Sequence, residues 1–416
     1  MNKLKQALFA GVAAGILAVA SAPAWAGDIR VDGFPDFNTH LDKQIPLFKE
    51  ANPDTNVTYQ MNNHGDHHKK LTTNLATGSG AGDVVIVDVG FIGSFINAGG
   101  FENLSDPKYG ADALKDQFVG YAWDQGKGTD GNQYGIPVDI GPGVMYYRRD
   151  VLDSVGAKIE DVISDWDSYI DYGRKLKEKN VFLIADAADV AGTIIRTTVK
   201  PGEGFFFDAE GNSLITSPRF VEAFTRAKQV RDEGLDAQIG AWTNEWYGGF
   251  KQGTVATQLS GAWLLGHLQN WMAPDTKGKW GVSNLPDGIY GSWGGSFLAI
   301  PKQSQNKEEA WAFIKFLASK PEAQIASLKD IGAFPVLKAT YSDAAFGEPI
   351  EFLDGQKARE LFAEVAQKVP AVAPQKGDLI AEDVVLGGAL AEVLNDGKDV
   401  MEALKDAERL VKRRVK

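Results

Sequence analysis

Tryptophan and acidic side chains are the residues of this 416-residue chain whose types and spacing could recognise a small polar molecule. Aromatic faces cover the apolar faces of pyranose rings, and a carboxylate accepts hydrogen bonds from hydroxyl pairs more strongly than a neutral acceptor does. Asp88 and Asp139 each follow an apolar run. Six of the ten tryptophans lie close together in the sequence, at Trp242, Trp246, Trp263, Trp271, Trp280 and Trp293. These residues predict an aromatic site with carboxylate acceptors.

Amide, imidazole and flexible backbone groups extend the candidate site. Asn and His side chains both donate and accept hydrogen bonds, and a Gly-Gly pair lets backbone N–H groups approach a ligand. The predicted ligand-binding residues are Asn38, His40, Asn63, His64, Asp88, Asp139, Trp242, Trp246, Trp263, Trp293, Gly294, Gly295 and Phe334. Each type also has a structural explanation, because large aromatics fill cores, acidic residues cap helices and Gly-Gly pairs form bulges.

Alternating strands and helices must position these side chains. The pattern predicts strands at 28–31, 57–61 and 84–87, with helices at 39–51, 66–77 (capped by Asp66) and 92–98. Ligands of open α/β sheets lie beyond the carboxyl ends of the strands. We therefore expect Asn38, Asn63, Asp88 and Asp139 near one rim.

The stretch from Tyr134 to Leu152 joins this pattern to the rest of the chain. Its sequence is YGIPVDIGPGVMYYRRDVL, in which Gly141-Pro142-Gly143 predicts a sharp corner before a strand at 144–147. Further on, we expect a helix within 159–179, a strand at 181–185, an amphipathic helix at 217–233, one helix at 306–324 and a last helix at 400–416.

Four blocks resemble the extracellular solute-binding proteins of carbohydrate ABC transporters, the family of the maltose-binding type. The first is the Tyr134–Leu152 stretch, which matches the family segment that crosses from one lobe to the other. The others are GDVVIVDVGFIGSFINAGGFENLSD from Gly82, NEWYGGFKQGTVATQL from Asn244, and WGGSFLAIP from Trp293 followed by a helix and a Gly332–Pro335 turn. The matches are scattered over nearly the whole chain after residue 26.

The resemblance implies an α/β fold of the periplasmic-binding-protein type, with two hinged lobes and a ligand cleft between them. We expect a first lobe of residues 27–136 plus 294–343 and a second lobe of 137–293 plus 344–416. It further implies a monomer that binds a carbohydrate, delivers it to the membrane permease of an ABC importer, and uses no cofactor and no catalytic residue.

Composition indicates an exported protein. Residues 1–26 carry Lys3 and Lys5, an apolar run and an Ala-Trp-Ala cleavage site, which together predict a signal peptide. The chain has no cysteine, which excludes disulfides and argues for a free periplasmic protein rather than a lipoprotein. Without Lys3 and Lys5, 41 basic residues face 55 acidic ones, a formal charge of −14 that argues against nucleic acid as a partner.

Other functions remain as alternatives. A glycosidase would also have paired carboxylates in a tryptophan-lined cleft, but no nucleophile elbow or zinc motif is present. A polyol, sugar acid or phosphorylated polyol could use the same fold if Arg148, Arg149, Arg196 or Lys200 reached the cleft. His64, His67 and His68 permit a metal site at helical spacing, but no fourth ligand is evident and we expect no metal.

Overall fold

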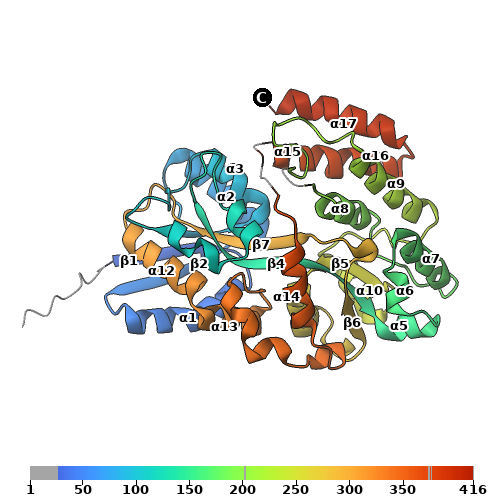
Figure 1. The fold of residues 1–416 in the computed structure, drawn as a ribbon, viewed down its shortest axis with the longest axis horizontal. Coiled ribbons are helices and arrows are strands. Elements are labelled where there is room, and N and C mark those ends of the chain that lie inside the picture. Colours follow the sequence, from blue (N-terminus) through green and yellow to red (C-terminus); the bar gives the residue numbers. More distant parts are fainter. Residues whose placement is uncertain (1–26, 201–202, 373–374, 376, 416) are drawn as a thin grey trace, which may run out of the picture.

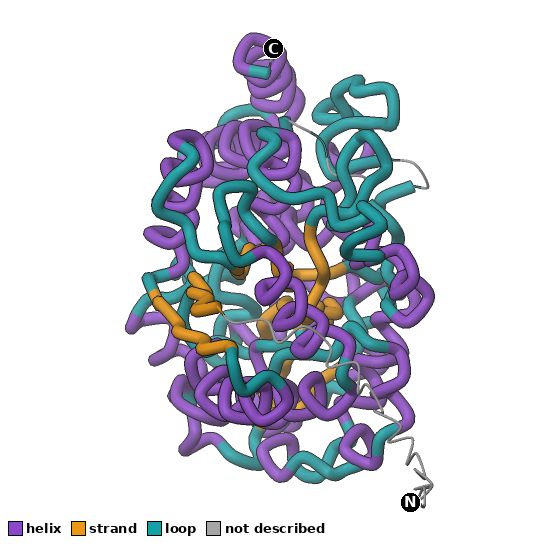
Figure 2. The backbone as a smooth tube through the Cα atoms, turned by 90° about the vertical axis from the view of Figure 1, so that its left-hand side faces the viewer, coloured by secondary structure: helices purple, strands orange, loops and turns teal. Residues whose placement is uncertain are grey.

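The computed structural model describes residues 27–200, 203–372, 375 and 377–415. The predicted signal peptide therefore lies outside the described residues. Helices surround a twisted sheet that runs through the middle of the molecule, as Figures 1 and 2 show from two directions. No helix in the described part of the chain is long and apolar enough to span a bilayer.

One seven-stranded mixed sheet connects the two halves of the molecule. Its order is β2-β1-β3-β7-β4-β5, with β6 also paired to β4, and only the β1–β2 and β1–β3 pairs are parallel. The strands are β1 (Gly27–Gly33), β2 (Thr55–Met61), β3 (Val84–Asp88), β4 (Gly135–Arg148), β5 (Thr257–Gly261), β6 (Trp280–Ser283) and β7 (Ser292–Ala299). Strand β3 is apolar and buried from Val84 to Val87, as expected for a strand covered on both faces.

Strand β4 belongs to both halves, because its first part pairs with β7 and its second part with β5 and β6. Gly141, Pro142 and Gly143 lie inside this strand, so the predicted sharp corner is wrong. The strand instead shifts register against β7 between Ile140 and Pro142. A Cβ atom at Gly141 would overlap the carbonyl oxygen of Trp293. These glycines therefore allow two strands to approach closely, and they do not reverse the chain.

Helices pack on both sides of this crossing. On the β1–β3 side, Figure 1 shows α2 and α3 above the sheet and α1 and α13 below it; on the β5–β6 side, α7 to α9 and α15 to α17 form the other half. The helices are α1 (Phe37–Ala51), α2 (His64–Thr77), α3 (Val89–Asn97), α4 (Gly120–Gln125), α5 (Arg149–Ser154), α6 (Ile159–Val162), α7 (Trp166–Lys177), α8 (Ala188–Thr197), α9 (Pro218–Asp232), α10 (Asn244–Gln252), α11 (Leu264–His267), α12 (Lys307–Ser319), α13 (Pro321–Ile331), α14 (Ala358–Lys368), α15 (Asp378–Glu382), α16 (Leu390–Asn395) and α17 (Val400–Arg414).

Three expected elements differ from the structure for local reasons. The helix predicted over 306–324 is two helices, because Pro321 lacks the N–H that would continue α12 and instead begins α13. Helix α2 begins at His64, so Asp66 lies in its first turn rather than at its N-cap. The strand predicted at 181–185 is reduced to isolated bridges from Phe182 to Val255 and from Ile184 to Asp236.

The described residues form three hydrophobic clusters, of which the smallest lies around Val85, Val87 and Phe297. One cluster fills the β5–β6 side around residues such as Tyr169, Phe220 and Phe224, which are fully buried. A larger cluster continues from the β1–β3 side across the crossing and includes Phe48, Phe313 and Trp280. The fold thus joins two packed halves through β4 and β7, as the two-lobe prediction requires.

Candidate ligand-binding site

A row of polar residues crosses the sheet where the two halves meet. Ser296 of β7 pairs with Asp88 of β3 on one side and with Asp139 of β4 on the other. The two candidate carboxylates, which lie 51 positions apart in the sequence, therefore flank one serine. We call Asp88, Ser296 and Asp139 the acidic row.

Asp139 is the least satisfied member of the acidic row. Its Oδ1 atom is buried and has no hydrogen-bond partner. Burial raises the pKa of Asp139 to about 6, against the opposing effect of hydrogen bonds from Ser296, and the charge of Asp88 raises it further. An acceptor that lacks a donor at neutral pH can be satisfied by a ligand hydroxyl group.

Asp88 is held in place by helix ends and imidazoles. Its side chain caps α3 by accepting from the Gly90 N–H at 2.8 Å, and its Oδ2 lies 3.6 Å from His64 Nε2. Its own N–H donates to His68 Nε2 at 3.1 Å. The helix-cap explanation considered for Asp88 is therefore correct, and the second oxygen still faces the exposed His64 side chain.

Backbone freedom next to the acidic row comes from Gly294 and Gly295. Their φ angles are 73° and 120°, which only glycine adopts without strain. Trp263 Nε1 donates to the carbonyl of Trp293 at 2.8 Å, and both rings are partly exposed. Trp293 also packs against Gly143, where a Cβ atom would overlap its ring. The two tryptophans are thus fixed beside the acidic row.

Trp242 and Trp246 form the next layer of rings. Trp242 is 51% exposed and stacks on Trp263 with ring centroids 5.8 Å apart and an interplanar angle of 17°. Trp246 is buried and donates to Gln258 Oε1 at 3.2 Å, while Gln258 Nε2 donates to Asp189 at 2.8 Å. Burial raises the pKa of Asp189 to about 6. Trp246 therefore supports Trp242 from behind rather than reaching a ligand itself.

An aromatic strip continues from Trp263 along the following helical segment. The strip consists of Trp242, Tyr247, Trp263, His267 and Trp271. His267 lies edge-on to Trp242, Trp263 and Trp271 at centroid distances of 5.5, 5.5 and 5.6 Å. Trp271 Nε1 donates to His267 Nδ1 at 3.1 Å. Burial lowers the pKa of His267, and the neighbouring Asp36 carboxylate partly offsets that effect.

Asp36 connects this strip to the β1–β3 side. Its Oδ2 lies 3.5 Å from His267 Nδ1, and its φ angle of 76° is unusual for a residue other than glycine. The residue precedes α1, in the loop that follows β1. The two sides of the molecule therefore meet at Asp36 and His267.

Besides Trp246, the predicted residues His40 and Phe334 are buried, which corrects the prediction for them, whereas the predictions for Asn38 and Asn63 stay predictions. His40 is 3% exposed and lies 3.6 Å from Asp330 of α13, because it packs on the inner face of α1. Phe334 is fully buried against Tyr341, Phe346 and Phe362. Asn38 lines a separate groove of about 470 Å³ between α1 and β2, and Asn63 is an exposed residue before α2.

The histidine cluster is occupied by internal hydrogen bonds. His67 Nε2 lies 2.7 Å from the Ile86 carbonyl, and His68 Nδ1 lies 2.7 Å from the His64 carbonyl. Because His68 Nε2 accepts from Asp88, both of its ring nitrogens are used, and burial lowers its pKa to about 4. Within the described ranges, no group of three or more His, Cys, Asp or Glu side chains could hold a metal ion.

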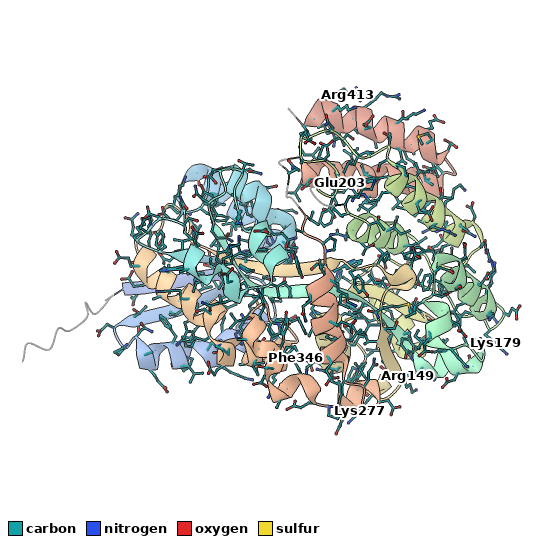
Figure 3. The ribbon with its side chains drawn as sticks, in the orientation of Figure 1. Arg149, Lys179, Glu203, Lys277, Phe346 and Arg413 are labelled. Atoms are coloured by element: carbon teal, nitrogen blue, oxygen red, sulfur yellow. The ribbon has the colours of Figure 1, made fainter. Side chains whose placement is uncertain are left out.

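Three of the four basic residues considered for an anionic ligand have other partners. Arg148 binds Asp150 and the Phe250 carbonyl, Arg149 binds the Trp280 carbonyl, and Arg196 binds Glu382. Figure 3 shows Arg149 at the lower right of the molecule, far from α2 and α3. Lys200 is exposed at the edge of the described residues. Three of these four side chains are therefore held by other groups of the protein.

The predicted ligand-binding residues did not include Ser296, Asp36, His267 or Trp271, although Trp271 is one of the six clustered tryptophans. The spacing of Trp263, His267 and Trp271 is four residues each time, which places all three on one face of a helix and could have indicated the strip. Ser296 and Asp36 have no comparable signal, because strand register and a left-handed loop residue decide their positions.

A two-lobe α/β fold, with a polar row and exposed tryptophans where the lobes meet, defines a hinged binding protein for small molecules. The profile of the bacterial extracellular solute-binding protein family matches residues 43–352. The chain therefore belongs to that family, as its sequence motifs predicted.

Known proteins support the same assignment. The chain is 29% identical over 396 residues to the lactose-binding protein of Rhizobium radiobacter, with 89% of each chain covered. It is 24% identical over 303 residues to the arabinooligosaccharide-binding protein of Bacillus subtilis strain 168, covering 70% of this chain and 68% of that one. A solved structure of an extracellular solute-binding protein of family 1 matches with a TM-score of 0.80 and 26% identity, covering 93% of this chain and 99% of that chain.

Proposed function

We propose that this protein is the periplasmic sugar-binding component of an ABC importer. It binds a neutral mono- or oligosaccharide between its lobes and presents it to a membrane permease. The observation that carries the proposal is the acidic row beside Trp263 and Trp293, since paired acceptors and aromatic faces are what a pyranose ring requires.

The proposed roles follow from the contacts of each residue. Asp139 Oδ1 and the Oδ2 of Asp88, which lies beside His64, accept from sugar hydroxyl groups. Backbone N–H groups of Gly294 and Gly295 donate to sugar oxygens. Trp242, Trp263 and Trp293 cover the apolar ring faces. The names of the relatives, which bind lactose and arabinooligosaccharides, agree with a hydroxyl-rich ligand.

The two lobes consist of residues 27–136 plus 294–343 and of residues 137–293 plus 344–416. Sugar contacts from both lobes favour the closed form by the difference between the affinities of the closed and open forms. The closed protein then docks on the permease. It acts as a monomer, without catalysis, after export and removal of residues 1–26, and nucleic acid is not a partner.

The proposal is tested by a thermal-shift screen of the chain from residue 27. The panel contains galactose, lactose, arabinose, arabinotriose, maltose, maltotriose, glycerol 3-phosphate, galacturonate and sorbitol. A ligand at a hundred times its Kd should add about 2.7 kcal/mol to the free energy of unfolding. We expect a neutral sugar to raise the melting temperature and to be recovered unchanged.

Two results would contradict this function. Stabilisation only by glycerol 3-phosphate, galacturonate or sorbitol would indicate a non-sugar solute-binding protein. Release of new reducing ends from the oligosaccharides would indicate a glycosidase, the other candidate class.

A further inference from the structure

The two ends of the central sheet differ in exposure. Strand β5 is at one end of the sheet order and is buried at every position. Strand β2 is at the other end and is partly exposed, with Met61 at 50%. Among the described strands, β2 pairs with β1 alone. We call the side of β2 that faces away from β1 the free edge, and such an edge can accept a strand of another chain.

The backbone groups of Val57, Tyr59 and Met61 point toward the free edge. The Asn62 N–H donates to the Gly33 carbonyl of β1 at 3.0 Å. The backbone groups of successive residues in a strand point to opposite sides, so the even-numbered residues of β2 bond β1 and the odd-numbered ones face away from it. Three residues therefore present N–H and carbonyl groups that no described strand pairs.

Strand β2 also lacks the features that commonly protect an edge. Its sequence from Thr55 to Met61 is TNVTYQM, which contains no charged residue and no proline. Its pairing with β1 continues without a bulge from Gly27 to Gly33. Lysine, proline and bulges are the usual means by which proteins prevent pairing at an exposed edge. Their absence favours an edge that another chain uses.

A groove of about 470 Å³ lies beside the free edge, and helix α1 forms its other wall. Figure 1 shows α1 and β2 on the left of the molecule, away from α7 to α9. Alternate residues of a strand share one face, so a strand added beside β2 would place every second side chain in this groove. The groove is lined by Asn38, Asp42, Ile45, Pro46, Val57, Tyr59 and Met61.

Asp42 gives the groove a preference for a basic side chain. Its carboxylate is exposed and has no ion pair among the described residues, whereas the neighbouring Lys43 pairs with Asp330. Pro46, one helical turn further along α1, has no N–H to donate to the Asp42 carbonyl. Both groups of Asp42 accept hydrogen bonds, and no residue that lines the groove is basic.

We propose that the groove between α1 and the free edge of β2 is a docking site for an extended segment of another protein. The segment adds a strand beside β2, with apolar side chains at alternate positions and a basic side chain beside Asp42. Hydrogen bonds to the β2 backbone supply affinity, and the groove supplies specificity. A second copy of this chain fits less well, because its own β2 has no basic residue to place beside Asp42.

The first test measures binding of a fluorescent peptide to the chain from residue 27. The peptide has about six residues and spans about 20 Å when extended. Valine, lysine and valine alternate with threonine, so that they share one face, and a matched peptide has glutamate in place of lysine. Fluorescence anisotropy should show at least about tenfold tighter binding of the lysine peptide. Asp42→Asn should reduce this ratio to about threefold or less.

Two lysine substitutions distinguish the groove from the surface around it. Met61→Lys places a charge at the free edge and should weaken binding of the lysine peptide at least about fivefold. Leu47→Lys is the matched control, because Leu47 is 49% exposed on α1 but does not line the groove, and it should retain the wild-type affinity. Equal losses in the two variants would contradict a site at the edge.

Residue-resolved hydrogen exchange tests the strand pairing itself. With the lysine peptide bound, the amides of Val57, Tyr59 and Met61 should exchange at least about tenfold more slowly. The amides of Thr58 and Gln60, which already bond β1, should change little. Protection of all five amides alike, or of none, would overturn the proposed pairing.

Three further results would overturn the proposal. The first is the absence of saturable binding of the lysine peptide, and the second is equal affinity for both peptides. The third is slower exchange of Val57, Tyr59 and Met61 at rising protein concentration without peptide, which would assign the edge to a second copy of the chain. All groove residues lie on the β1–β3 side of the crossing, so these outcomes do not depend on the proposed sugar function.

Discussion

On one side of the β3–β7–β4 crossing, Asp88 is held by an α3 cap and by two histidines, and on the other side Trp242 and Trp263 stack on each other. The β3 side thus offers one fixed acceptor, Asp88, and the other side offers ring faces beside the second acceptor, Asp139. Hydrogen bonds to carboxylates depend on direction, whereas ring contacts depend mainly on area. We infer that Asp88 and Asp139 set the orientation of the sugar and that the tryptophan rings supply most of the apolar contact.

The largest expected effect is the loss of stability caused by a substitution at Gly141, which lies where these two regions meet. A side chain at position 141 would overlap the Trp293 carbonyl, where β4 and β7 approach each other most closely. Gly141→Ala should therefore lower the free energy of unfolding by at least about 3 kcal/mol, as measured by urea unfolding. Gly192→Ala, on helix α8 with open space around it, is the control and should not destabilise the protein. Equal free energies of unfolding for the two variants would show that position 141 has room for a Cβ atom, and would contradict the close approach of β4 and β7.

Removal of the central acceptor should weaken binding most. Asp139→Ala leaves sugar hydroxyl groups without a partner, so we expect an affinity loss of at least about 30-fold, or about 2 kcal/mol. Asp139→Asn keeps an acceptor and should lose less. Calorimetric titration measures both, and melting of the free variants at pH 7 should show no loss of stability, because burial disfavours this carboxylate and its Oδ1 has no hydrogen-bond partner. Wild-type affinity of the alanine variant would place Asp139 outside the site.

Removal of the Trp263 ring should weaken binding nearly as much as removal of the Asp139 carboxylate. Trp263→Ala removes the stacking face and the bond to the Trp293 carbonyl, and should cost about 2 kcal/mol of binding free energy. Trp263→Phe retains a ring but loses the Nε1–H donor, so its affinity should lie between those of the wild type and the alanine variant. An alanine variant that binds as the phenylalanine variant does would show that the ring contributes little.

The pH dependence of binding should be a smaller effect, and it should distinguish two of the carboxylates whose pKa burial raises. Asp139 and Asp189 both have pKa values raised to about 6 by burial. If ionised Asp139 is the acceptor, affinity should fall by up to about tenfold per pH unit below pH 6. Asp139→Asn should remove this dependence, whereas Asp189→Asn should retain it. The same pH profile in Asp139→Asn and the wild type would contradict the assignment.

The stability of the free protein should depend on pH in the direction opposite to that of the binding affinity. A carboxyl group whose pKa is higher in the folded than in the unfolded state stabilises the fold fully below about pH 4, and this contribution is lost as the pH rises through about 6. The wild-type protein should therefore become less stable relative to Asp139→Asn as the pH rises from 4 to 6. Urea unfolding at several pH values measures the difference.

Local sequence patterns predicted elements better than they predicted contacts. Strand β3 and helix α9 were predictable because a short apolar run indicates a buried strand, and apolar residues at helical spacing indicate an amphipathic helix. Gly141-Pro142-Gly143 looked like a corner, yet it lies inside β4, because the requirement for glycine comes from Trp293, some 150 positions away. The same limit explains His40 and Phe334, which are polar-loop and turn candidates by sequence but pack inside the fold.

Within the candidate site, the types of residue were easier to predict from the sequence than their places in the structure. Asp88 and Asp139 were expected near one rim and flank Ser296. Tryptophans were expected as a group, but only the structure separates the exposed Trp242 and Trp271 from the buried Trp246 and Trp280. Tertiary packing decides which face of α10 and of the segment after β5 is buried, and therefore which tryptophan side chains are exposed.

The measurement that tests the central claim most directly is the distance between the lobes with and without sugar. The chain has no cysteine, so Lys70→Cys on α2 and Arg413→Cys on α17, both exposed, allow two spin labels to be placed in the otherwise native protein. Pulsed electron paramagnetic resonance should show a shorter and narrower distance distribution at saturating concentration of the sugar that the thermal-shift screen selects. An unchanged distribution with bound sugar would contradict a ligand that both lobes hold.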